Sequence, residues 1–190
     1  MAYIGKKGGW NDVRSWFSIG MIARNAAIGA LYFVLSVAAF YMSYGMIQFR
    51  LSEILNILVF FNPAYTLGLT VGCLLSNILG AGIGLASWWD LLIGTGCTLL
   101  ACLLMIPFKQ LFLASLMPVI VNGIGVGLEL FYLFGMSETT PLYACMGWVA
   151  LGEVIMVPVV GYIIAHVLKR YGSKFLVGIL GATRNTDFVW

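Results

Sequence analysis

Polar and charged side chains interrupt the apolar sequence between residues 44 and 53, which reads YGMIQFRLSE. Gln48, Arg50 and Glu53 lie here between two apolar stretches, where charged groups near hydrocarbon are costly. Arg50 and Glu53 are three residues apart, so they would share one face of a helix. The segment therefore predicts a ligand-binding site, although a structural ion pair at a helix start accounts for the same spacing.

A second set of polar side chains is scattered over the later apolar stretches. We predict that these residues converge with the first set: Asn77, Trp88, Trp89, Asp90, Asn122 and Glu129. Amides and carboxylates can read the hydrogen-bonding edges of a ligand, and indole rings can stack on a flat one. No cation lies near Glu129 in the sequence, which favours a functional role. These residue types indicate a site for a small, planar, polar solute that carries an amine.

Several polar residues also have purely structural interpretations. Trp88 and Trp89 are typical of the aromatic belt at a membrane interface. Asn122 can bond a neighbouring helix. Glu153, near the middle of the last long apolar stretch, can be a protonated carboxyl group bonded between helices or a functional group. The residues alone leave these alternatives open.

Motifs for catalysis and metal binding do not occur in the sequence. It has one histidine, His166, and no HExxH, Ser-His-Asp or Walker pattern. Its four cysteines form no CxxC pair, which argues against a zinc or redox site. We therefore predict no catalytic residues, no metal ion and no cofactor, in a protein that is not an enzyme.

The composition predicts an integral membrane protein. Of the 190 residues, 62% are hydrophobic and 9% are charged, whereas soluble domains carry about 25% charged residues. The net charge of +3 is modest and indicates orientation in a membrane rather than binding to nucleic acid. We expect no cleavable signal peptide, because the first apolar stretch lacks a small-residue cleavage site.

The apolar stretches that must position the polar residues predict an all-α membrane protein with six transmembrane helices. Pro63 predicts a break after Asn62, so that residues 51–80 form two short helices. The six helices are expected at residues 22–43, 51–61, 65–80, 88–107, 110–134 and 142–168. The domains are expected as an interfacial N-terminal helical segment at 1–20, the transmembrane domain at 21–170 and a cytoplasmic or interfacial tail at 171–190.

Cations lie before the first predicted helix, at Lys109 and after the last helix. The positive-inside rule places all three groups on the cytoplasmic side. Four crossings precede Lys109 when residues 51–80 form a hairpin, which satisfies the rule. Both termini are then cytoplasmic, and the polar residues gather toward the outer half of the membrane.

Three segments of the sequence resemble the QueT family, the substrate-binding S-components of energy-coupling factor (ECF) transporters linked to queuosine precursors. They are IQFRLSEIL at 47–55, Asn62-Pro63-Ala64, and GLTVGCLLSNILG at 68–80. The resemblance covers roughly residues 20–168 and implies six helices with a ligand pocket that faces outside. It also implies a bacterial plasma-membrane location and three partners: a transmembrane coupling subunit and two ATPase subunits.

The implied ligand is a 7-deazaguanine with an aminomethyl group, or queuine. The resemblance makes Glu53, Asp90 and Glu129 the candidate carboxylates for this ligand, with Gln48 and Arg50 shaping an outer lid together with Asn77. S-components of this class commonly dock through an Ala-x-x-x-Ala face on the first helix, which Ala26 and Ala30 match. Two alternatives remain: an S-component for another vitamin-like molecule, and an autonomous proton-coupled carrier that uses Glu129 and Glu153.

Overall fold

The computed structural model describes residues 13–39, 49–170, 177–178 and 180–186, and this part of the chain is helical without strands. The long helices are α2 (Ile19–Ala38), α5 (Tyr65–Gly82), α6 (Ile93–Met105), α7 (Leu111–Tyr132) and α8 (Leu142–Val154). Helix α8 continues through the π-helical η5 (Ile155–Gly161) into α9 (Tyr162–Arg170). The short elements are α1 (Val13–Trp16), η2 (Leu51–Asn56), α4 (Ile57–Phe61), η3 (Trp88–Leu91) and η4 (Met136–Glu138). The predicted all-α class is confirmed.

Five helical segments of the described chain are long and apolar enough to cross a membrane: 19–38, 65–82, 88–105, 111–132 and 142–168. The remaining predicted helix, at residues 51–61, is present as a shorter apolar segment, η2 followed by α4. We call this segment the half-helix (Leu51–Phe61). Its six 3-10 residues and five α-helical residues together span about 20 Å, roughly two thirds of a hydrocarbon core. A count of six crossings and the orientation of the termini remain predictions.

The predicted break at Asn62-Pro63 is confirmed. The backbone of Asn62 is extended, with φ −149° and ψ 110°, and its side-chain oxygen accepts a hydrogen bond from the backbone N–H of Ala64 at 3.0 Å. An asparagine side chain that bonds two residues ahead forms a local turn, and Pro63 disfavours helix in the residue before it. The chain therefore reverses here, and α5 begins at Tyr65.

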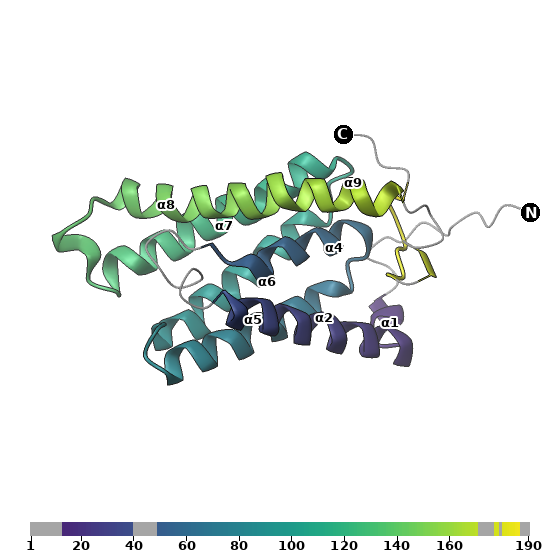
Figure 1. Ribbon diagram of the computed structural model, residues 1–190, viewed down its shortest axis with the longest axis horizontal. Helices are drawn as coiled ribbons and strands as arrows, with labels where there is room; N and C mark the ends of the chain where they lie inside the picture. The colour runs from purple at the N-terminus through teal and green to yellow at the C-terminus, as the bar shows by residue number, and fades with distance from the viewer. Residues whose placement is uncertain (1–12, 40–48, 171–176, 179, 187–190) are drawn as a thin grey trace, which may run out of the picture.

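The half-helix lies at the centre of the bundle, between the layer of α8 and α9 and the layer of α2 and α5 (Figure 1). Its apolar side chains from Ile57 to Phe61 are all buried, and Val59, Phe60 and Phe61 have almost no exposed surface, whereas Leu51 and Leu55 are partly buried. A short helix hydrophobic all round is stable only when other helices enclose it. The N-terminal end of the half-helix is therefore held deep inside the bundle, where it can present polar groups away from lipid.

Helix α2 packs closely against α5 through glycines. A Cβ added at Gly68 would lie 2.5 Å from the backbone oxygen of Asn25, and one added at Gly72 would lie 2.6 Å from that of Gly29. The buried face of α2 consists of Met21, Asn25, Gly29, Tyr32 and Ser36. Ala26 and Ala30 are exposed and lie outside this face.

The tail reaches the C-terminal end of the half-helix. Arg184 donates hydrogen bonds from its guanidinium to the backbone oxygens of Phe60 at 3.0 Å, Val59 at 3.2 Å and Ile106. Asn185 donates from Nδ2 to the same oxygen of Phe60 at 2.8 Å. The last carbonyls of a helix lack donors within the helix and carry partial negative charge, so a cation caps them well. Burial lowers the pKa of Arg184 from its ordinary value.

Further bonds hold the same part of the tail. Tyr65 donates its hydroxyl to the backbone oxygen of Leu180 at 2.6 Å, and Asn62 donates from Nδ2 to that of Gly181 at 2.7 Å. Gly181 has φ +58° and lies against Arg24, whose Nη1 would be 2.6 Å from an added Cβ. We call residues 180–186 the tail clamp, since they join α2, the half-helix and α5. Of the predicted interfacial N-terminal segment, residues 1–12 lie outside the described part.

Candidate functional site

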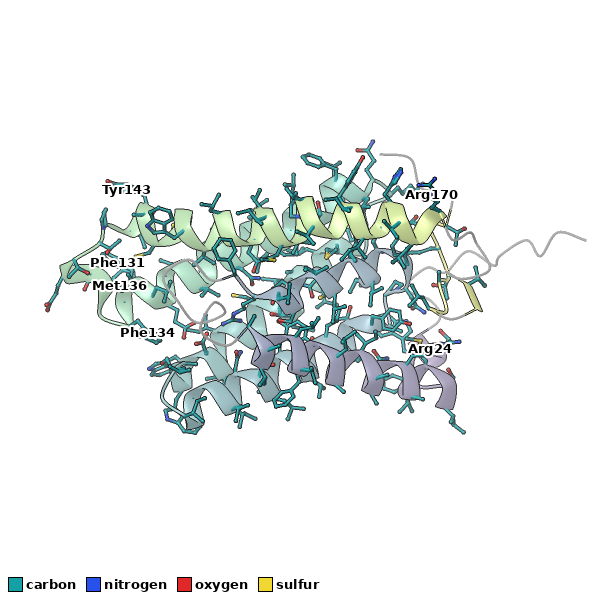
Figure 2. The ribbon with its side chains drawn as sticks, viewed as in Figure 1. Arg24, Phe131, Phe134, Met136, Tyr143 and Arg170 are labelled. Atoms are coloured by element: carbon teal, nitrogen blue, oxygen red, sulfur yellow. The ribbon has the colours of Figure 1, made fainter. Side chains whose placement is uncertain are left out.

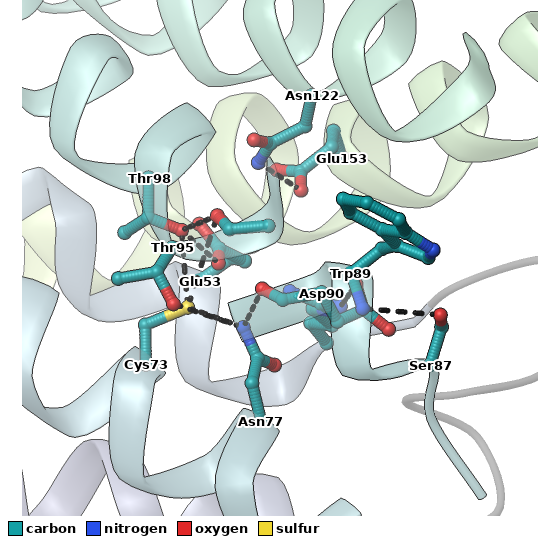
Figure 3. Close-up of polar contacts among 12 residues, drawn as sticks. Glu53, Cys73, Asn77, Ser87, Trp89, Asp90, Thr95, Thr98, Asn122 and Glu153 are labelled. Atoms are coloured by element: carbon teal, nitrogen blue, oxygen red, sulfur yellow. Dashed lines mark hydrogen bonds and ion pairs between the residues drawn. The ribbon is translucent and has the colours of Figure 1, made fainter. Parts of the chain in front are cut away.

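Glu53 lies on the half-helix and is fully buried, with hydrogen-bond partners for both carboxylate oxygens. Tyr32 on α2 donates its hydroxyl to Oε1, and Asn56 donates from Nδ2 to Oε2. The hydroxyl of Thr98 on α6 lies 3.5 Å from Oε1 (Figure 3). A buried carboxylate is tolerated when such donors replace water. In this structure Glu53 therefore ties the half-helix to α2 and α6.

Asp90 lies at the start of the apolar segment 88–105 and is held there through its backbone. Ser87 caps the η3 turn, since its hydroxyl accepts from the backbone N–H of Trp89 at 3.1 Å. Asn77 on α5 donates from Nδ2 to the backbone oxygen of Asp90 at 2.8 Å and to the hydroxyl of Thr95 at 3.2 Å. Asn77 thus fixes the position of the turn that carries the Asp90 carboxylate.

Arg50 forms an ion pair with Asp90. Its Nη2 lies 3.3 Å from Oδ1 of Asp90, and both side chains are buried. The three-residue spacing had suggested that Arg50 would form its ion pair with Glu53. Arg50 is also close enough to Glu53 for their charges to interact. A buried ion pair offers little net stability, but removing one partner is costly. The pair fixes the Asp90 carboxylate close to the entrance of the half-helix.

Glu129 on α7 is 2% exposed, and neither of its carboxyl oxygens accepts a hydrogen bond from an N–H or hydroxyl group among the described residues. Two ionisable side chains interact with it: Asp90, whose carboxyl group lies within hydrogen-bonding reach of Glu129, and Arg50. A buried acceptor that lacks a donor loses the hydrogen bonds it would make with water and gains none. Glu129 therefore presents two acceptor oxygens beside Asp90 that suit donor groups of a ligand.

Asn122 lies on α7 two helical turns before Glu129 and is bonded to Glu153 on α8. Its Nδ2 donates to Oε1 of Glu153 at 2.6 Å (Figure 3). Both side chains are buried, and Oδ1 of Asn122 and Oε2 of Glu153 have no partner in the described part of the chain. The bond to a neighbouring helix, which was the structural alternative for Asn122, is present, and two acceptor atoms remain beyond it.

Trp88 and Trp89 flank Asp90 in sequence but are 65% and 53% exposed. Neither indole ring is enclosed with the buried carboxylates in this structure. The stacking role expected of them remains a prediction, and their exposure also fits an interfacial aromatic pair.

Of the predicted site residues, Gln48 lies outside the described part of the chain. The structure brings four of the others together, namely Arg50, Asn77, Asp90 and Glu129. Sequence reasoning missed Tyr32, Thr95 and Thr98, which bond the predicted residues. A tyrosine in the middle of an apolar helix was a usable signal for Tyr32, because a buried hydroxyl group needs a partner.

Among the described residues no group of three or more His, Cys, Asp or Glu could hold a metal ion.

Two hollows on the surface of the bundle do not include these polar residues. One, of about 260 Å³, lies between α2 and α5 and is lined in part by Trp16, Ala26 and Gly68. The other, of about 340 Å³, lies between α7 and α8 and is lined by apolar and small side chains such as Gly123 and Ala150. The polar site is therefore separate from both hollows.

Comparisons with known proteins bear on the whole bundle. The family model described as "QueT transporter" matches residues 22–170. A relative named queuosine precursor transporter QueT, from Lactococcus lactis subsp. cremoris (strain MG1363), is 34% identical over 165 residues, which cover 78% of this chain and 90% of the relative. No solved structure matches the chain. With five helices that are apolar enough to span a membrane, these matches identify a multi-pass bacterial membrane protein that belongs to the QueT transporter family.

Proposed function

We propose that the chain is the substrate-binding subunit of an ECF-type importer and binds a queuosine precursor, a 7-deazaguanine with an aminomethyl group or queuine. Family membership and the name of the Lactococcus relative support the substrate class. In this proposal the chain supplies the binding site, and two ATPase partners hydrolyse ATP and act through a transmembrane coupling subunit.

The observation that carries the proposal is the environment of Glu129. Its two buried oxygens accept no hydrogen bond from an N–H or hydroxyl group among the described residues, and its carboxyl group lies within hydrogen-bonding reach of that of Asp90. The buried charged residues of the described bundle are Arg50, Glu53, Asp90, Glu129 and Glu153. Four carboxyl groups against one guanidinium favour a ligand that brings positive charge, because a nearby cation offsets the cost of a buried carboxylate. The amine of the precursor supplies that charge.

The exposed face of α2 supports docking to a coupling subunit. Ala26 and Ala30 are four residues apart and exposed, whereas Asn25 and Gly29 face α5. Small side chains on an exposed helix face allow another helix to approach closely within a membrane. We assign this alanine face to the coupling subunit.

The orientation follows from the two ends of the bundle. Arg24 and Arg170 lie at one end, and Phe131, Phe134, Met136 and Tyr143 lie at the opposite end (Figure 2). The positive-inside rule makes the arginine end cytoplasmic. Glu129 lies in the last turn of α7 before the aromatic end, so the site is proposed to open toward the outside.

Binding without ATP tests the proposal directly. The purified full chain in lipid nanodiscs should bind 7-aminomethyl-7-deazaguanine when measured by calorimetry with no nucleotide present. Glu129→Gln should weaken binding at least about tenfold, since a hydrogen bond to a charged group contributes about 1.5–3 kcal/mol. Glu138→Gln is the matched control, because Glu138 is exposed in the loop between α7 and α8. Absence of binding by the unaltered chain would reject the substrate class.

Buried carboxyl groups also suit a proton-coupled carrier. Glu129 and Glu153 both have oxygens without partners in the described bundle, as a group that takes up and releases protons would need. Uptake by the lone chain in proteoliposomes under a pH gradient, with no ATPase present, would support this second function. Mass spectrometry of ligand that co-purifies with the chain separates a queuosine precursor from another vitamin-like solute.

A further inference from the structure

The bond between Asn122 and Glu153 leaves one acceptor atom on each side chain without a partner in the described bundle. Nδ2 of Asn122 is used by Oε1 of Glu153, and the atoms that remain, Oδ1 of Asn122 and Oε2 of Glu153, have no partner in the described bundle. Both side chains are 3% exposed. A bond that served only to join α7 and α8 would not require two further buried acceptors, since each one costs free energy.

Glu153 is held at this position by an irregular part of its helix. It lies in the last turn of α8, directly before the π-helical segment η5, which contains Pro158. Proline lacks the N–H that an α-helix would use at this point, and a π turn is one way to relieve the conflict. Gly161 in η5 packs on the half-helix, where an added Cβ would lie 3.5 Å from the side chain of Ile57. The carboxyl group of Glu153 is buried, close enough to Glu53 and Arg50 for electrostatic interaction.

Asn122 and Glu129 belong to one interior face of α7. They are seven residues apart, which corresponds to about 10 Å along the axis and nearly the same direction around it. Each belongs to a group with unpartnered acceptor oxygens: Glu129 near Asp90 at one end, and Asn122 with Glu153 at the other. The face thus carries two separate acceptor groups at a spacing that suits the two ends of one small elongated ligand.

We propose that Glu153 and Asn122 form the second end of the ligand site and read a pair of neighbouring N–H donors on a flat heterocycle, while Glu129 and Asp90 hold the ligand amine. This inference rests on the proposed function and assigns roles within that site. Two acceptors on one bonded pair of side chains can serve an edge on which a ring N–H and an exocyclic NH₂ lie side by side, as in a 2-aminopyrimidinone ring. The pair of carboxylates at the other end matches an ammonium group.

Three probes separate the two ends: 7-aminomethyl-7-deazaguanine, its analogue without the 2-amino group, and its analogue with a methyl group in place of the aminomethyl group. The unaltered chain should prefer the first probe over each analogue by about tenfold or more. In Glu153→Gln, Asn122 can still donate its hydrogen bond to the side-chain oxygen of the glutamine. The NH₂ group of the glutamine then replaces the acceptor oxygen, so that a donor faces the donors of the ligand. This variant should lose the preference for the 2-amino group and keep the preference for the amine, whereas Glu129→Gln should do the reverse.

Several results would overturn the assignment. The first is that Glu153→Gln loses the same affinity for all three probes, and the second is that it loses none. The third is that the unaltered chain shows no preference for the 2-amino group. Asn122→Leu, which removes the other acceptor together with the donor to Glu153, replaces Glu153→Gln if that variant does not fold, and Glu138→Gln is the control for each series. If the unaltered chain binds none of the probes, the proposed function itself fails. If it binds them without the crossed pattern, only the roles of Glu153 and Asn122 fail.

Discussion

The side-chain oxygen of Asn25 on α2 accepts a hydrogen bond at 3.0 Å from the backbone N–H of Gly68 on α5. Gly68 lies in the first turn of α5, so the bond joins the start of α5 to α2. The bond requires the two backbones to approach closely, and only glycine at position 68 leaves that space. One interhelical bond thus sets which face of α2 turns inward and which face stays exposed.

Gly68→Ala should destabilise the protein, because the new Cβ would lie 2.5 Å from the backbone oxygen of Asn25. Overpacking of this kind costs about 1–3 kcal/mol. Thermal unfolding in detergent, followed by circular dichroism, should show a lower melting temperature. Gly82→Ala is the control, since nothing lies within 4 Å of a Cβ at that position. Equal melting temperatures for the two variants would mean that α2 and α5 separate easily.

Ala26→Leu and Ala30→Leu should abolish uptake of the ligand by cells that express the complete transporter, while the purified variants bind the ligand as before. Leucine on the exposed alanine face holds a partner helix away but meets no buried group of this chain. Co-purification of the coupling subunit should fall in parallel. Ala38→Leu is the control, because Ala38 is exposed at the other end of α2. Loss of ligand binding in the purified variants would instead assign the alanines to packing of the fold.

Arg184→Ala should lower the melting temperature without a change in the ligand preferences described above. The substitution removes donors from the carbonyls of Val59, Phe60 and Ile106, and buried acceptors without partners cost about 1–3 kcal/mol each. Arg170→Ala removes an exposed cation near the same end and should leave the melting temperature unchanged. An Arg184→Ala variant that is as stable as the unaltered chain would show that the tail clamp contributes little.

The helices and the break at Asn62-Pro63 could be predicted from the sequence because they follow from local physics. Long apolar stretches mark helices that can span a membrane, and proline acts on the residue before it. The expected helix at 110–134 corresponds to Leu111–Tyr132, and the expected helix at 142–168 contains a π-helical interruption at Pro158 that the apolar pattern does not reveal. Hydropathy reports length and composition, whereas helix type depends on individual hydrogen bonds.

Contacts within the candidate site were less predictable, because they join distant parts of the chain. Arg50 and Glu53 are three residues apart, yet Arg50 pairs with Asp90, forty residues further on. The backbone of Arg50 is extended, and the residues that follow it form a 3-10 helix rather than an α-helix. The guanidinium therefore does not lie on the helical face that the three-residue spacing implied. Glu53 bonds Tyr32 and Thr98, which lie on two other helices. Convergence of the polar residues could be expected, but the partner of each could not.

The tail clamp has a consequence for biosynthesis. The carbonyls of Val59 and Phe60 receive their donors from residues that lie about 125 positions downstream. While the ribosome is still translating the later helices, those oxygens have no such donors, and the nascent half-helix cannot reach its final arrangement. The half-helix is among the earlier parts to be translated. Its final hydrogen bonds nevertheless depend on release of residue 184 from the ribosomal tunnel.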